Sequence, residues 1–87
     1  MKAIELNNEI TLHVAFFFNG QKREEGTYVN GKKHGVFHGW YENGAKAFEE
    51  TYFHGVLNGY YILWDRNGTT ISEGEITFVE KNAKKIL

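Results

Sequence analysis

The sequence of 87 residues contains neither cysteine nor proline. Without cysteine, no disulfide and no thiolate metal site can hold the chain together. A chain of this length forms one small domain with limited apolar surface to bury. Ser72 is the only serine and lies in no elbow-turn motif, so the sequence offers no Ser-His-Asp arrangement for nucleophilic catalysis.

No charge of one sign dominates the sequence. Lys and Arg total 10 and Asp and Glu total 11, for a net charge of −1, and the two signs are mixed along the chain. A nucleic-acid surface needs a clustered basic patch, so we expect no nucleic-acid partner. The balance also weakens attraction to an anionic membrane. A phospholipid-binding module is the alternative function, and it would use Lys32, Lys33, Lys46, Lys81, Lys84 and Lys85.

Long hydrophobic runs are missing as well. Residues 1–6 carry charge and lack the apolar stretch of a signal peptide. The longest apolar run covers residues 14–18, which is far too short to span a bilayer. We therefore expect a soluble, cytoplasmic protein.

Glycine and aromatic residues, by contrast, are abundant, at 10 glycines and 16% aromatics. They recur with a period of 24 residues. When residues 16–55 are aligned with residues 40–79, twelve of forty positions are identical, against roughly three expected from composition. The structural repeat positions are Phe16, Trp40 and Trp64 in an aromatic column and Gly20, Gly44 and Gly68 in turns.

The period predicts one domain over 1–87, with repeats over 16–39, 40–63 and 64–79 and a half-repeat over 3–15. The tail over 80–87 is expected to form a helical turn, a frayed end or a cap over the last strand. Asn-Gly pairs at 19–20, 43–44 and 67–68 predict type I′ turns, which need positive φ at both central residues. Further turns are expected near 30–33 and 54–58.

The segments between the turns alternate in polarity and are rich in β-branched and aromatic residues. We predict an all-β fold, a single antiparallel meander of about three 24-residue β-hairpin repeats. The expected strands lie near 3–6, 10–18, 21–29, 35–42, 45–53, 59–66 and 69–78.

A register follows if the tight turn pairs Glu42 with Ala45. The expected opposite pairs are Trp40 with Ala47, His38 with Glu49, and Val36 with Thr51. One face then carries Leu12, Val14, Phe16, Val36, His38, Trp40, Tyr60, Ile62 and Trp64. The other carries Phe17, Tyr28, Phe37, Tyr41, Phe48, Tyr52, Tyr61, Leu63 and Ile76. A sheet with one wet face is apolar on one side only, so either this sheet curls over itself or another molecule covers one face.

The repeats share a sequence pattern. It runs Trp40-Tyr41-Glu42-Asn43-Gly44, then Glu49, Tyr52, Gly55 and Gly59, and leads into Trp64. This pattern resembles the MORN repeat family, specifically the bacterial MORN-variant type, over residues 16–78. Glu50 departs from it, because the other copies have Gly26 and Gly74 there. Val79 replaces the turn glycine, so the array is expected to end there.

The resemblance implies an elongated open array of hairpins used for protein association. Some family members are credited with binding membrane phospholipid, and bacterial variants are often labelled antitoxin-like. We therefore expect a non-catalytic protein-interaction module, antitoxin-like by resemblance, that uses no cofactor.

Two residue types invite a catalytic or metal interpretation. Glu25, Glu49 and Glu73 recur once per repeat, as structural positions do, and two intervening strand spacings keep them about 10 Å apart. We expect them to be solvated cross-strand partners, with Glu49 beside His38. The histidines have no cysteine beside them, and a strand keeps His34 and His38 from converging. No catalytic residue and no metal site is predicted.

The aromatic column of Phe16, Trp40 and Trp64 is expected to be core, because stacked identical columns hold neighbouring repeats together. The opposite stripe is less obviously covered, and surfaces rich in Tyr and Phe are typical of interface cores. A protein partner of unidentified kind is predicted on the stripe of Phe37, Tyr41, Phe48, Tyr52 and Tyr61. A homodimer that covers a face or joins open strand edges is the other arrangement we expect.

Overall fold

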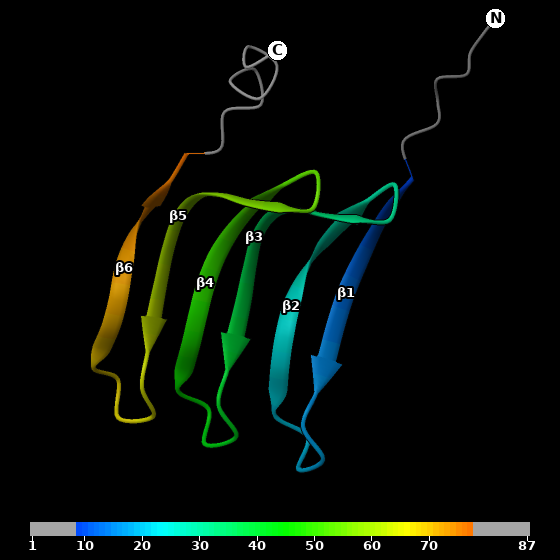
Figure 1. Ribbon diagram of the computed structural model, residues 1–87. Helices are drawn as coiled ribbons and strands as arrows, with labels where there is room; N and C mark the ends of the chain where they lie inside the picture. Colours follow the sequence, from blue (N-terminus) through cyan, green and yellow to red (C-terminus); the bar gives the residue numbers. More distant parts are fainter. Residues whose placement is uncertain (1–8, 78–87) are drawn as a thin grey trace, which may run out of the picture.

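The computed structural model describes residues 9–77, and every regular element among them is a β-strand (Figure 1). Six strands pair in chain order, each antiparallel to the next, so the predicted all-β meander is confirmed. The expected strand over 3–6 and the tail over 80–87 lie outside the described residues. The strands are β1 Ile10–Phe16, β2 Lys22–Val29, β3 Lys32–Trp40, β4 Lys46–Phe53, β5 Val56–Trp64 and β6 Thr70–Ile76.

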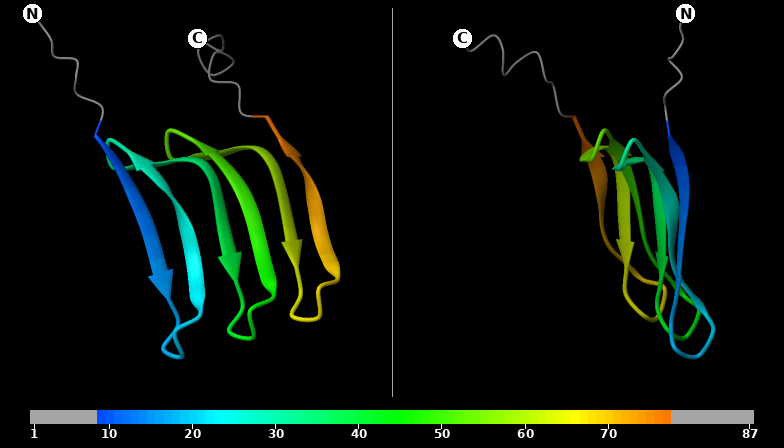
Figure 2. Two further views of the ribbon diagram at one scale, coloured as in Figure 1. Left: turned by 180° about the vertical axis from the view of Figure 1, so that it is seen from behind. Right: turned by 90° about the vertical axis from the view of Figure 1, so that its right-hand side faces the viewer.

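The sheet is a single curved layer, as the side view in Figure 2 shows. The molecule measures 48 × 34 × 13 Å, and two stacked sheets would already lie about 10 Å apart before their outer side chains are counted. Over residues 9–77, therefore, the sheet does not curl over itself. That part of the chain also contains no helix long and apolar enough to cross a membrane.

The turns at the lower end of Figure 1 contain the three Asn-Gly pairs, but they are not type I′ turns. In the first of them the Gly20 N–H donates to the Phe17 carbonyl (2.9 Å) and the Phe17 N–H donates to the Gln21 carbonyl (2.7 Å). Gly20 has a φ of 92°, whereas Asn19 has no positive φ. The Asn19 side chain accepts from the Gln21 N–H at 2.9 Å, so the asparagine stabilises the turn through its side chain and only the glycine enters the left-handed region.

Turns with positive φ at both central residues lie at the opposite end of the sheet. Asn30 and Gly31 have φ angles of 52° and 81°, and His54 and Gly55 have 50° and 85°. These are two-residue hairpins of the I′ pattern, since Val29 pairs directly with Lys32. Because these turns are so short, β3 and β5 begin three residues earlier than predicted.

The predicted register is confirmed in the middle of the sheet and wrong beside the turn. Val36 opposes Thr51 and His38 opposes Glu49, as expected. Trp40, however, opposes Lys46 and not Ala47, because the register shifts by one residue between Gly39 and Trp40. Such a β-bulge leaves two residues of one strand opposite one of the other and increases the local twist.

The core of the sheet lies on the face that carries Phe37, which has no exposed surface. The rings of Tyr28 and Tyr52 contact it edge-on, with centroids 5.7 and 5.6 Å away. Gly26 leaves room for the same ring, since a Cβ there would lie 2.4 Å from its Cδ2 atom. The prediction that Phe16 belongs to the core is wrong, because Phe16 lies on the other face and is 56% exposed.

Candidate interaction surface

The face opposite Phe37 exposes a row of apolar side chains, and we call it the open face. Residues of its central row oppose one another from β1 to β6, with Val14, Glu25, His38, Glu49, Ile62 and Glu73 in line. Leu12 is 68% exposed, Tyr60 51% and Val36 46%. The open face comprises Leu12, Val14, Phe16, Val36, His38, Trp40, Tyr60, Ile62 and Trp64 together with the carboxylates of that row.

Lysines from the starts of β2 and β4 lie over the tryptophans of the open face. The Lys22 ammonium is 5.4 Å from the Trp40 ring centroid, and the Lys46 ammonium is 5.6 Å from that of Trp64. Both tryptophans are therefore half-buried under long side chains and do not belong to the core. A shallow hollow of about 240 Å³ lies beside Trp40 and Lys22. It is smaller than the roughly 300–1,000 Å³ of typical ligand pockets.

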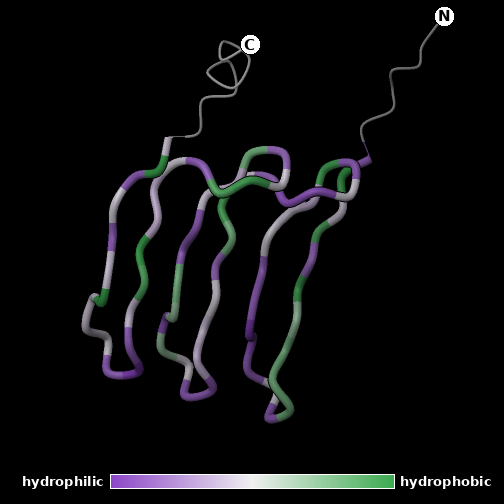
Figure 3. Tube along the Cα trace, viewed as in Figure 1, coloured by the Kyte–Doolittle hydropathy of each residue, from purple (hydrophilic) through white to green (hydrophobic). Residues whose placement is uncertain are grey.

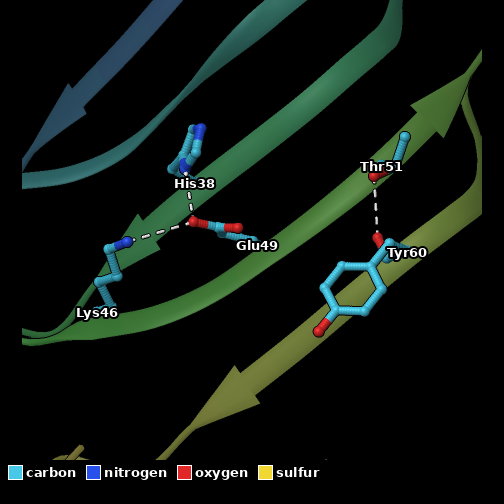
Figure 4. Close-up of polar contacts among 5 residues, drawn as sticks. All are labelled: His38, Lys46, Glu49, Thr51 and Tyr60. Carbon is cyan, nitrogen blue, oxygen red and sulfur yellow. Dashed lines mark hydrogen bonds and ion pairs between the residues drawn. The ribbon is translucent and has the colours of Figure 1, made fainter. Parts of the chain in front are cut away.

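The glutamates of the open face are paired within the chain. Lys22 donates to Glu25 at 2.6 Å, and this hydrogen bond lowers the pKa of Glu25. Glu49 lies 3.4 Å from the Lys46 ammonium and 3.5 Å from His38 Nδ1, as Figure 4 shows, so the predicted pairing of Glu49 with His38 is confirmed. Glu25 and Glu49 thus each have a lysine partner of their own, Lys22 and Lys46.

The last strands extend this polar network. Tyr60 donates its hydroxyl to Glu73 at 3.0 Å, and that hydrogen bond raises the pKa of Tyr60. Thr51 donates its hydroxyl to the Tyr60 carbonyl at 2.9 Å, next to the Glu49 cluster (Figure 4). The backbone carbonyl of the exposed Tyr60 therefore accepts a hydrogen bond from a side chain of β4.

The stripe predicted to bind a partner lies on the packed face and is engaged by the chain itself. Phe37 is fully buried, so its assignment as a partner contact is wrong. The Tyr41 hydroxyl donates to the Trp64 carbonyl at 2.7 Å, and the Tyr52 hydroxyl donates to Glu50 at 3.1 Å. Phe48 covers Gly39, where a Cβ would lie 2.1 Å from its Cε2 atom, and Tyr61 lies 3.5 Å from the Ser72 hydroxyl.

Sequence reasoning missed Leu12, Val36 and Tyr60 as the exposed apolar residues of the sheet. The signal that could have found them is glycine inside strands. Gly26 and Gly39 stand within β2 and β3, and a strand glycine often marks a close approach of another group. The rings of Phe37 and Phe48 lie directly over these glycines on one face of the sheet. The opposite face is therefore the open face.

Two histidines meet at the end of the sheet opposite the Asn-Gly turns. The rings of His34 and His54 have centroids 5.3 Å apart, and the His54 N–H donates to His34 Nδ1 at 3.4 Å. Across residues 9–77, no group of three His, Asp or Glu side chains is placed to hold a metal ion.

Tyr52 gives the packed face a pH dependence in the alkaline range. Burial and the neighbouring Glu50 raise the pKa of Tyr52 from 10.0 to about 12. Because the pKa is higher in the folded state than in the unfolded state, the neutral phenol adds to the free energy of unfolding. This contribution is complete below pH 10 and is lost as the pH rises toward 12. We expect Tyr52→Phe to show a shallower fall in the urea midpoint over this range than the wild type. Equal slopes for both proteins would contradict the assignment.

Comparison with protein-family models, curated proteins and solved structures finds no match to this chain. Within residues 9–77, the open face and the outer sides of β1 and β6 are the surfaces that bear on function.

Proposed function

We propose that the chain is a non-catalytic protein-interaction module of MORN-like hairpins that binds a protein partner through its open face. One observation carries the proposal: the core lies entirely on the packed face, while Leu12, Phe16, Val36 and Tyr60 remain exposed on the other side of the same sheet. Several exposed apolar side chains on one face of a sheet mark an interaction site.

The composition of the open face suits a protein better than a lipid headgroup or a substrate. Aromatic and aliphatic side chains of β1, β3 and β5 alternate with the paired carboxylates of β2, β4 and β6, so the face offers both apolar contacts and hydrogen-bond acceptors to a protein. Lys22 and Lys46 each contact an indole ring and a carboxylate, so their charges are already compensated. The resemblance to bacterial MORN-variant repeats makes a toxin one class of partner to look for.

Capture of tagged full-length protein from its own cell lysate tests the proposal. The wild type is expected to retain a protein in stoichiometric amount, and Val36→Glu to lose it, because a carboxylate would then replace an exposed apolar side chain of the open face. Val36 is 46% exposed, so the substitution leaves the fold intact.

Phe18→Glu is the matched control. Phe18 lies in the turn between β1 and β2 and is fully exposed, at 105%. This variant should capture as much partner as the wild type. Failure of the wild type to capture any protein, or equal capture by Val36→Glu, would contradict the proposal.

A further inference from the structure

Among residues 9–77, no charged side chain, glycine or proline of β1 opposes pairing of its outer edge with another strand. None of its seven residues, from Ile10 to Phe16, is Asp, Glu, Lys or Arg, and none is glycine or proline. Figure 3 colours most of this strand as hydrophobic. Within residues 9–77 only β2 pairs with it, on the inner side. Natural sheets usually blunt such an edge with charges, proline or bulges.

The backbone groups that β1 leaves free belong to its apolar residues. The Asn30 N–H donates to the Glu9 carbonyl at 2.8 Å, so Glu9 directs its backbone toward β2. In an antiparallel pair, successive residues direct their N–H and C=O groups alternately to the two sides. The residues that point outward are therefore Ile10, Leu12, Val14 and Phe16.

The same residues place their side chains on the open face. Ile10 is 69% exposed, Leu12 68%, Phe16 56% and Val14 37%. A strand that pairs with this edge therefore covers free hydrogen-bonding groups and exposed apolar surface at once.

The other edge of the sheet is protected. β6 carries Glu73 and Glu75, which alternate with half-buried Ser72 and Gly74. Pairing of β6 with its own copy would bring carboxylates of like charge together, at a cost in free energy. The two edges thus differ in the way that a closed dimer requires, with one edge available and the other blocked.

We propose that a second copy of this chain pairs with the edge of β1, antiparallel and in one register. The residues whose backbone N–H and C=O groups point outward are every second one from Ile10 to Phe16. The register in which all of these groups form hydrogen bonds with the second copy has its two-fold axis at His13. Leu12 then opposes Val14 of the second copy, and Ile10 opposes Phe16 of the second copy. Every such pair is apolar, so β1 is complementary to itself.

This dimer joins the two open faces into one continuous sheet face, because directly opposite residues of an antiparallel pair point to the same side. The association is isologous and closes on itself. Pairing of β1 with β6 of another copy would instead leave free edges at both ends and would build chains of growing length. The dimer and the proposed partner site share Leu12 and Phe16, but their tests are separate, because Val36 on β3 lies away from the new contact.

Light scattering with size-exclusion chromatography tests the dimer on the full chain. The wild type is expected at twice the monomer mass of 10.1 kDa, and Leu12→Lys at the monomer mass, because two lysines would then face each other's apolar strand. Ile71→Lys is the matched control, since Ile71 is 61% exposed and lies on β6. It should remain dimeric. A monomeric wild type, a dimeric Leu12→Lys, a monomeric Ile71→Lys or species that grow with concentration would overturn the proposal.

The register has its own test, helped by the absence of native cysteine. At the two-fold axis the pair at position 13 is non-hydrogen-bonded, with Cα atoms about 4.5 Å apart, which a disulfide can bridge. His13→Cys should therefore form a covalent dimer on mild oxidation. Ala15→Cys should not, because its two copies would lie about 13 Å apart along the strands. Cross-linking of Ala15→Cys but not of His13→Cys would overturn the register.

Discussion

Phe37→Ala is expected to lower the free energy of unfolding by about 3–5 kcal/mol, the range found when a buried phenylalanine is truncated. Phe37 is the single fully buried large side chain among the described residues. Its ring connects β2, β3 and β4 through Gly26, Tyr28 and Tyr52. Because the sheet has no second layer, no neighbouring element can collapse into the cavity. Urea unfolding followed by circular dichroism measures the loss.

Phe18→Ala provides the control for this prediction. The same atoms are removed, but Phe18 is fully exposed, and its truncation should change the free energy of unfolding by no more than about 0.5 kcal/mol. Similar losses for the two variants would mean that the stability of the sheet does not depend on the packed face.

Gly26→Ala is expected to destabilise the protein by about 1–3 kcal/mol, as overpacking a filled core does. An added Cβ would lie 2.4 Å from Phe37 Cδ2 and 2.5 Å from its Cγ, closer than real Cβ atoms come to any neighbour. The φ of Gly26 is not in the left-handed region, so the cost comes from the collision with the ring and not from backbone strain. Thermal and urea unfolding both measure it.

Two comparisons separate this collision from a general effect of alanine in a strand. Gly74→Ala should be close to neutral, within about 1 kcal/mol, since its Cβ would lie 3.3 Å from the Tyr61 hydroxyl and 3.4 Å or more from the ring carbons, distances that a small shift of the Tyr61 side chain relieves. In the Phe37→Ala background, Gly26→Ala should cost much less than in the wild type, because residues in contact are not additive. Strict additivity of the two changes would show that the ring and the glycine are not in contact.

The two proposals address different parts of one surface. Val36 lies in the interior of the open face, whereas Leu12 lies at its β1 edge. Val36→Glu is expected to abolish capture of the partner and leave the dimer intact, and Leu12→Lys is expected to dissociate the dimer. A joined open face would double the apolar surface offered to a partner.

Turn positions and strand order were accessible from the sequence because they depend on local signals. The Asn-Gly pairs mark the lower turns at 24-residue spacing, and alternating polarity marks the strands between them. The pairs Val36 with Thr51 and His38 with Glu49 were also predicted, although the pair beside the turn was not, because the bulge between Gly39 and Trp40 shifts the register to the expected one. The type of each turn could not be predicted from the sequence. An asparagine such as Asn43 can stabilise a turn either by adopting a positive φ or by accepting a hydrogen bond with its side chain, and the Asn-Gly pair is the same in both cases.

The sequence by itself determined that this chain is an antiparallel meander with aromatic residues on both faces. It could not determine which face is the core, because both faces carry aromatic residues and the composition of the two faces does not distinguish them. That choice depends on Gly26 and Gly39, which have to lie directly under Phe37 and Phe48. Such contacts join residues of neighbouring strands through their register and the bulges in it, so only the tertiary structure decides that Phe37 is buried while Phe16 remains exposed.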